Sequence, residues 1–256
     1  NSNVSVAQAN GTDEAVTTGS ETSETGSIEI AQVAEPIGKI EELSGSVTVT
    51  RADGTQVSLS KGDSIFQGDK LETGDGAAVG LVFVDDTTFA LGEGGSMVMD
   101  EMVYDPATKE GQFFASVTEG VFSFVSGQIS KSAVDAMSIE TPVITIGIRG
   151  TTGAGRAGPE GSPNTVSLLP DASGNTGEMT IGNQGGGPPV VLSTPGATSS
   201  TTSAFAAMPP PTILNPAQIN QQYGAALNSM PPSPIAAAAQ QQGQGEGEGE
   251  GEGEAE

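Results

Sequence analysis

A Gly-Asp pair recurs at every sixth residue in the stretch 62–76, and this recurrence limits what the chain can fold into there. The pairs are Gly62-Asp63, Gly68-Asp69 and Gly74-Asp75. Glycine adopts positive φ without a Cβ penalty, and an aspartate can hydrogen-bond the backbone two residues on, so each pair predicts a tight turn. Too few apolar residues lie between the turns for a helix. We therefore expect short β-strands there.

Strand patterns continue on both sides of this stretch. Residues 40–51 alternate apolar and polar, and Asp53-Gly54 predicts a hairpin turn into a returning strand at 56–59. Residues 77–84 are almost wholly apolar and predict a central strand buried on both faces. Residues 96–104 and 112–117 predict a further hairpin, residues 120–125 a strand with both phenylalanines on one face, and residues 130–136 a helical turn or a polar loop. The predicted fold is all-β, either a compact β-sandwich or a short β-solenoid.

Composition divides the chain into four parts. Residues 1–36 are acidic, contain no base and predict a disordered segment, whereas 37–156 carry the strand patterns of a domain. Residues 157–193 hold three short strand candidates that pack on or extend this domain. Residues 194–256 are a Pro, Ser, Ala, Gln, Gly and Glu linker. Within it, Asn215 as N-cap and Pro216 at the first helical position predict a helix over 215–227, with Ile219, Tyr223 and Ala226 on one face.

The charge of the chain excludes several classes of function. The formal net charge is -24, with no Cys and no His. Nucleic acid and anionic membranes are unsuitable partners, because binding them requires cations that neutralise phosphates. The absence of Cys and His removes disulfides, thiolate or imidazole zinc sites and histidine-based catalysis. No apolar run is long enough to predict a transmembrane segment.

Three short motifs invite a chemical interpretation, and each is better explained without one. Asp86-Thr87-Thr88 departs from the Asp-Thr-Gly pattern of aspartic proteases and predicts a turn. Ser130-Lys131-Ser132 predicts a solvated loop, because adjacent side chains rarely converge on one nucleophile site. The Gly-Asp turns offer oxygen ligands that suit Ca²⁺, yet no calcium-loop spacing occurs. We predict no catalytic residue, no cofactor and no metal site.

Residues 37–155 resemble the FecR domain family. The resemblance rests on the order of Gly-Asp turns, the Asp-Asp-Thr turn, Glu-Gly-Val-Phe, and Thr-Pro followed by Gly-Ile-Arg-Gly-Thr. The family-motif residues, expected to act in structure or interaction, are Gly62, Asp63, Gly68, Asp69, Thr73, Gly74, Asp85, Gly120, Thr141, Pro142, Gly147, Arg149, Gly150 and Thr151.

The resemblance implies an extracytoplasmic, non-enzymatic protein-interaction module of a Gram-negative bacterium, located in the periplasm, at the outer-membrane surface or outside the cell. The chain looks like the N-terminal module of a large surface-attached or secreted adhesin-type protein, whose partner would be another envelope or surface protein. Two alternatives stay open. One is the periplasmic signal-receiving domain of a metal-uptake regulator of the anti-sigma type, and the other is an adhesin retention module. The sequence does not specify an oligomeric state.

Arg149 stands out because it is embedded in an apolar run. A buried charge without a partner costs several kcal/mol, so such an arginine needs a carboxylate or carbonyl partner. We expect Arg149 to pair with the Gly-Asp stretch, with Asp69 or Asp85 as its partner. The alternative is an exposed Arg149 at an interface with another protein, where arginine is enriched.

Overall fold

The computed structural model describes residues 35–234, and these residues form an all-β fold with one α-helix, as the sequence predicts. The first strands are β1 (Gly38–Ser44), β2 (Val47–Thr50), β3 (Gln56–Ser58), β4 (Ser64–Ile65), β5 (Lys70–Thr73), β6 (Ala78–Phe83), β7 (Thr88–Leu91), β8 (Ser96–Tyr104) and β9 (Gly111–Val125). After the 3₁₀ turn η1 (Ile129–Lys131) come β10 (Met137–Glu140), β11 (Thr145–Arg149), β12 (Thr152–Ala157), β13 (Asn164–Leu169), β14 (Glu178–Gly182), β15 (Val190–Leu192), β16 (Ala197–Thr201), β17 (Thr212–Ile213) and α1 (Pro216–Leu227).

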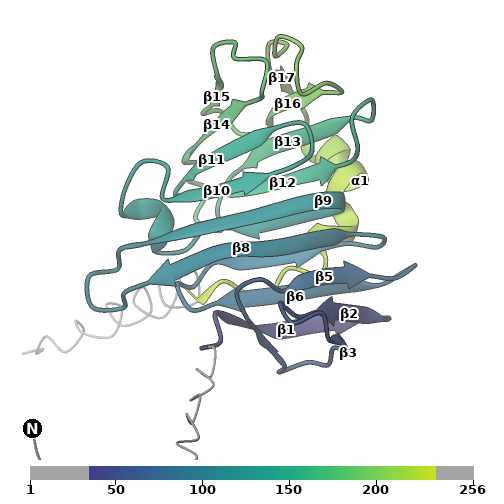
Figure 1. The fold of residues 1–256 in the computed structure, drawn as a ribbon. Helices are drawn as coiled ribbons and strands as arrows, with labels where there is room; N and C mark the ends of the chain where they lie inside the picture. Colours follow the sequence, from purple (N-terminus) through teal and green to yellow (C-terminus); the bar gives the residue numbers. More distant parts are fainter. Residues whose placement is uncertain (1–34, 235–256) are drawn as a thin grey trace, which may run out of the picture. The chain divides into compact units, whose positions relative to one another are not determined.

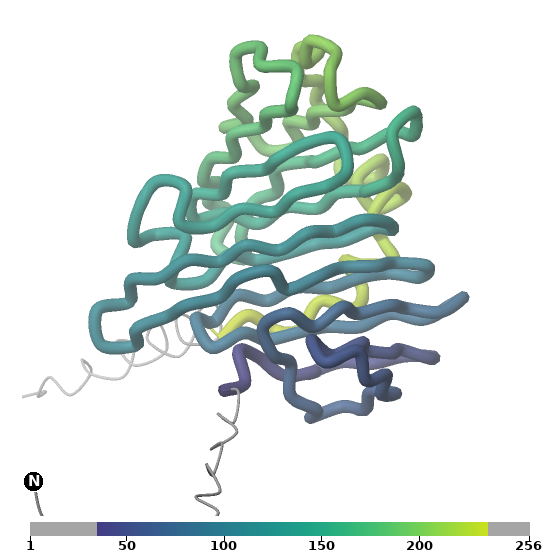
Figure 2. Tube along the Cα trace, viewed as in Figure 1, coloured from purple at the N-terminus to yellow at the C-terminus, as the bar shows by residue number. Residues whose placement is uncertain are grey.

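The 17 strands form one hydrogen-bonded network that divides into two layers. Layer A has the order β4-β1-β6-β7-β9-β12-β13-β16-β17. Layer B has the order β3-β2-β5-β8-β9-β10-β11-β14-β15. All these pairs are antiparallel except β9 with β10. Figures 1 and 2 show that the strands follow one another along the fold, from β1 at one end to β17 at the other.

Strand β9 belongs to both layers. Its first part pairs with β8 and β10 in layer B, and its second part, from Gly120 onward, pairs with β7 and β12 in layer A. Gly120 has φ 98° at this crossing, and a Cβ there would lie 2.5 Å from the Cα of Gly95. Both the left-handed backbone and the close approach require glycine. The two segments that the sequence suggests as separate strands are thus one strand of 15 residues.

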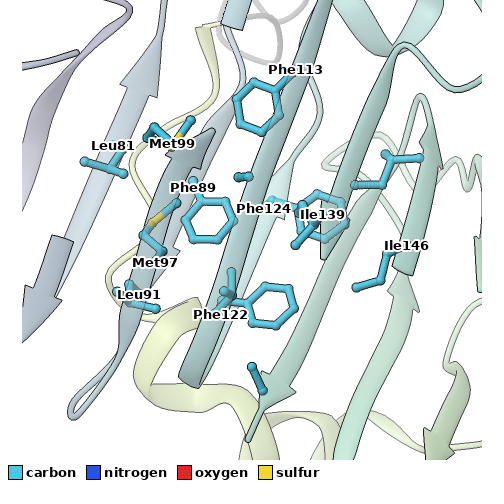
Figure 3. Close-up of a cluster of buried hydrophobic side chains, with 14 of the residues drawn as sticks. Leu81, Phe89, Leu91, Met97, Met99, Phe113, Phe122, Phe124, Ile139 and Ile146 are labelled. Carbon is cyan, nitrogen blue, oxygen red and sulfur yellow. The ribbon is translucent and has the colours of Figure 1, made fainter. Parts of the chain in front are cut away.

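One hydrophobic core fills the space between the layers. Layer A contributes Leu81 and Phe89 to it, and layer B contributes Met97 and Ile139, all with no exposed surface. Figure 3 shows these side chains meeting between the strands that carry them. Two layers that share one core have the arrangement of a β-sandwich, and the predicted all-β class is confirmed.

The helix at 216–227 forms where the sequence predicts it and covers the outer face of layer A. Asn215 accepts a hydrogen bond from the Gln218 N–H (3.0 Å), and the Gln218 side chain accepts one from the Asn215 N–H (2.9 Å). Ile219, Tyr223 and Ala226 are the buried side chains of the helix, as expected from their shared face. They form a second, smaller cluster with side chains of β7, β9, β12 and β13.

The linker predicted over 194–256 is wrong in one part, because residues Ala197–Thr201 form the strand β16 of layer A. Their small hydroxyl side chains are typical of a linker, yet they pair with β13, where Ser167 Oγ and Thr198 Oγ1 lie 2.7 Å apart. Strands β13, β14 and β15 occupy the three short segments predicted before it, and they extend both layers. The disorder predicted over 1–36 and the tail of the linker lie almost wholly outside the described residues.

Candidate functional site

The carboxylate of Asp85 is the centre of a buried hydrogen-bond network at the turn between β6 and β7. It accepts hydrogen bonds from the Thr87 N–H (3.0 Å), the Thr87 hydroxyl (2.8 Å) and the Ile129 N–H (3.3 Å). Thr87 Oγ1 in turn accepts the Gly127 N–H (2.9 Å). Asp85 has no exposed surface, and this burial raises its pKa, although the hydrogen bonds from Thr87 and Ile129 oppose the shift. The network fastens the β6–β7 turn to the segment after β9.

The same segment is tied to Thr151, the last residue of the predicted family motif. The Ser126 N–H donates to the Thr151 carbonyl (3.0 Å), and the Thr151 N–H donates to the Ser126 hydroxyl (2.8 Å). Asp85 and Thr151, far apart in sequence, therefore meet through residues 126–129. Together they hold the β6–β7 turn, the segment after β9 and the β11–β12 turn in contact.

Asp69 forms a second buried site, with Arg51 as its partner. One carboxylate oxygen accepts from the Arg51 guanidinium and from the Phe66 N–H (2.8 Å), while the other oxygen has no partner in the described structure. Arg51 also donates to the Ser64 carbonyl (3.2 Å) and lies over the Phe66 ring, 5.0 Å from its centre. Burial raises the pKa of Asp69, against the opposing effects of the Phe66 hydrogen bond and the Arg51 charge.

The remaining residues of the Gly-Asp stretch shape turns, as predicted. The Asp63 carboxylate accepts the Ser60 N–H (2.7 Å) beside Gly62, and the Gly68 N–H donates to the Met99 carbonyl (2.7 Å). The Thr73 hydroxyl donates to the Gly92 carbonyl (2.6 Å) and accepts the Gly95 N–H (2.8 Å). The Gly74 N–H donates to the Ser46 carbonyl (2.9 Å). The contacts of Gly68, Thr73 and Gly74 join strands and turns that are neighbours in the sandwich.

The Thr-Pro segment forms the turn between β10 and β11. Thr141 Oγ1 accepts the Ile144 N–H (3.0 Å), and Pro142 is exposed at the tip of the turn. Gly147 lies within β11, where a Cβ would stand 3.6 Å from the Asp135 carboxylate. Gly150, with φ 56°, turns the chain from β11 into β12.

The expected pairing of Arg149 with Asp69 or Asp85 is wrong. Arg149 is exposed at the end of β11, where Ile146 and Ile148 point into the core, and its guanidinium lies 3.4 Å from the Glu178 carboxylate. Strand register explains this partner, because residues 149 and 178 stand opposite each other in β11 and β14. An exposed pair of this kind contributes roughly 0–1 kcal/mol. Arg149 is exposed, as the alternative requires, and its contact with another protein stays a prediction.

Arg149 and Gly150 line an open groove of about 440 Å³ together with Ser130, Lys131, Ala133 and Val134. Lys131 makes no ion pair with any described residue, and the Val134 side chain is 60% exposed. An exposed apolar side chain and two cationic side chains thus line one groove on a chain of strongly negative charge. Such a groove suits a partner segment that carries a carboxylate beside small apolar groups. The sequence indicates Arg149 as a contact residue but gives no sign that Val134 would lie beside it.

The two serines of the Ser-Lys-Ser motif donate to backbone carbonyls in the structure. The Ser130 hydroxyl donates to the Gly127 carbonyl (3.0 Å) and the Ser132 hydroxyl to that of Ile129 (2.8 Å). Within residues 35–234, no group of acidic, Cys or His side chains is arranged to hold a metal ion. The same residues contain no helix with the length and hydropathy needed to cross a bilayer.

Residues 69–169 match the model of the family described as FecR protein. This range extends from the buried Asp69 through the end of β13. No curated protein matches the chain. Among solved structures it is similar to a cell surface anchoring domain, with 39% identity over 24% of this chain and 82% of that one and a TM-score of 0.24.

The chain is also similar to a protein described as an anti-sigma factor from Parabacteroides distasonis. Identity is 12% over 59% of this chain and 62% of that one, with a TM-score of 0.44. A second crystal structure of that factor gives the same values. The chain therefore spans less than two thirds of the length of that protein.

Proposed function

Because residues 69–169 match the FecR protein family, we propose that the chain is a non-enzymatic interaction module of the bacterial cell envelope. In this function it lies outside the cytoplasm of a Gram-negative bacterium, within a larger surface-associated or secreted protein. Its partner is another envelope or surface protein. Such a module acts by contact with its partner, so its function depends on a surface.

The groove between η1 and the β11–β12 turn is the observation that carries this proposal. Two cationic side chains, Lys131 and Arg149, line this groove together with the exposed Val134. Charge complementarity raises association rates and selects partners, while a buried apolar anchor supplies affinity. We therefore assign the groove to a partner segment with at least one Asp or Glu next to a small apolar side chain.

Site-specific photo-crosslinking in the native host tests the contact. A photoreactive residue replaces Val134 in one strain and Val103 in the control strain, since these two valines are 60% and 57% exposed. We expect a discrete crosslinked protein from position 134 that is absent from position 103. Charge reversal by Lys131→Glu with Arg149→Glu should abolish the product. Equal patterns from both positions, or a product that survives charge reversal, would contradict the groove as the contact site.

Fractionation of native cells with protease shaving tests the cellular location. A band much larger than 256 residues, removed by protease from intact cells or retained with the outer membrane, supports the surface-protein function. A modest inner-membrane band that is protected until the outer membrane is opened would favour a signal-receiving domain instead. Processing near the N-terminus together with outer-membrane retention would favour a retention module.

A further inference from the structure

The outer face of layer A carries a continuous row of small residues that crosses the strands. Cross-strand register aligns Gly80 with Ala90, Ala90 with Ser123, Ser123 with Ala154, Ala154 with Ser167 and Ser167 with Thr198. Residues that stand opposite each other in antiparallel strands point to the same face. We call these six residues the small-residue row. Their large neighbours in sequence, such as Phe89 and Phe122, point inward to the main core.

The segment from Leu214 to Pro231 covers this row. Ala90 and Ala154 contact the buried side of α1, and the Tyr223 hydroxyl lies 3.0 Å from Ser167 Oγ and 3.1 Å from Thr165 Oγ1. A Cβ on residue 80 would lie 2.3 Å from the Ser229 carbonyl oxygen and 2.8 Å from the Pro231 ring. The row is thus small because the covering segment lies directly against its backbone.

The covering segment is separate from the body of the sandwich in two respects. Its buried residues belong to the smaller hydrophobic cluster, and the main core contains no residue of α1. The FecR match ends at residue 169, so the row lies mostly inside the matched range and the cover lies outside it. Ser123 Oγ has no hydrogen-bond partner beneath the cover. Opening would hydrate this hydroxyl and expose Val121 and Leu169 of the sheet, while the main core stays enclosed between the two layers, so the body can remain folded without its cover.

We propose that residues Leu214–Pro231 form a latch that opens as a unit while the two-layer sandwich stays folded. Opening exposes the small-residue row, a face shaped to receive a helix because α1 already occupies it. The sequence continues for residues 235–256 beyond the latch. Opening of the latch therefore controls access to the outer face of layer A. This inference does not depend on the groove at Val134.

The absence of cysteine from the chain allows a direct test by thiol labelling of full-length variants. Ser123→Cys places the probe under the latch, and Ala154→Cys provides a second probe on the neighbouring strand. Ser199→Cys is the matched control, because Ser199 Oγ is also buried without a partner, but on the core side of layer A opposite Val166. A latch predicts that the thiols at positions 123 and 154 are labelled at least about tenfold faster than the thiol at position 199 under native conditions, since local opening precedes global unfolding.

A second variant distinguishes local opening of the latch from general destabilisation of the fold. Tyr223→Phe removes the hydroxyl that bonds to Ser167 and Thr165. It should accelerate thiol labelling at position 123 several-fold and leave labelling at position 199 unchanged. Equal labelling rates at positions 123, 154 and 199, or equal acceleration at all three, would overturn the proposal and make α1 an integral part of the sandwich.

An engineered disulfide supplies the opposite perturbation. Gly92→Cys with Ala225→Cys joins β7 to α1, because a Cβ on residue 92 would lie 3.4 Å from the Ala225 Cβ, close to the usual disulfide spacing. In the oxidised variant, hydrogen exchange of the α1 amides should slow toward the rate of the β-strand core, and reduction should restore it. An unchanged rate on oxidation would contradict separate opening of the latch.

Discussion

Asp69 and Arg51 form the one ion pair among the described residues in which the carboxylate is almost wholly buried, with Asp69 1% exposed. Their contact ties the first hairpin of the domain to the second Gly-Asp turn. Arg51 also spans the Ser64 carbonyl and the Phe66 ring, so a single side chain fixes the conformation of residues 64–69. The turn sequence alone does not specify this partner.

Replacing Arg51 by methionine should destabilise the protein by about 2–4 kcal/mol, because it leaves a buried carboxylate unpaired. Equilibrium urea unfolding of purified protein measures the effect. Lys61→Met is the matched control, since it breaks only the exposed pair with Glu42 and should change stability by less than about 0.5 kcal/mol. A similar small effect for both variants would show that the Arg51 pair contributes nothing.

Asp85→Asn should also destabilise the protein, by about 1–3 kcal/mol at neutral pH. An amide NH₂ in place of one carboxylate oxygen would face the donors that now reach Asp85 from Thr87 and Ile129. Asp86→Asn is the control, because Asp86 is less buried and asparagine accepts its φ of 68°.

The difference between wild type and Asp85→Asn should depend on pH in a defined direction. Burial raises the pKa of Asp85 above 3.8, so the folded state holds its proton to higher pH than the unfolded state does. The stability associated with this group is fully present below pH 3.8 and is lost as the pH rises through the folded-state pKa. The advantage of wild type over the variant should therefore shrink from acidic to neutral pH in urea unfolding. A growing advantage would mean that the pKa is lowered.

Gly120→Ala should cost several kcal/mol and should exceed the cost of Gly54→Ala by at least about 2 kcal/mol. Both glycines have positive φ, 98° and 84°, but only residue 120 has a neighbour that a Cβ would strike, at 2.5 Å, whereas residue 54 has none within 4 Å. The positive φ alone costs about 1–2 kcal/mol. Thermal unfolding of the two variants measures the difference, and equal costs would show that the crossing of β9 relaxes.

Arg149→Lys should change stability by less than about 0.5 kcal/mol, because the pair with Glu178 is exposed. Differential scanning calorimetry checks this. A clear fall in Tm would require a buried bidentate partner, which only arginine can engage. The same variant retains the charge of the groove, so binding to the proposed partner should weaken only modestly.

The strands and the helix can be predicted because their signals are local. Asn215 and Pro216 mark the start of α1, and alternation marks the strands on either side of Asp53-Gly54. The predicted partner of Arg149 is wrong because its apolar neighbours suggest burial, whereas Ile146 and Ile148 alternate with it and point inward. Residues 197–201 give no strand signal, since their burial depends on β13 and β17 rather than on their own hydrophobicity.

The long-range contacts of the candidate site cannot be predicted from the sequence for the same reason. Val134 lies in the groove beside Arg149 only because the connection from η1 to β10 returns toward the end of β11. The sequence identifies the turn residues Asp85 and Thr151 individually, but their link through Ser126 and Gly127 depends on tertiary structure. Patterns of spacing specify turns, and they do not specify which turns meet.

Because β9 passes from one layer into the other, the two layers of the sandwich cannot be separated without breaking this strand. A cut that separated the layers would divide this strand at Gly120 and leave each fragment with half of a central strand. Two such fragments would expose their shared core and could regain it only by reassembling. The sandwich is thus expected to fold and unfold in a single cooperative transition, although it consists of two layers.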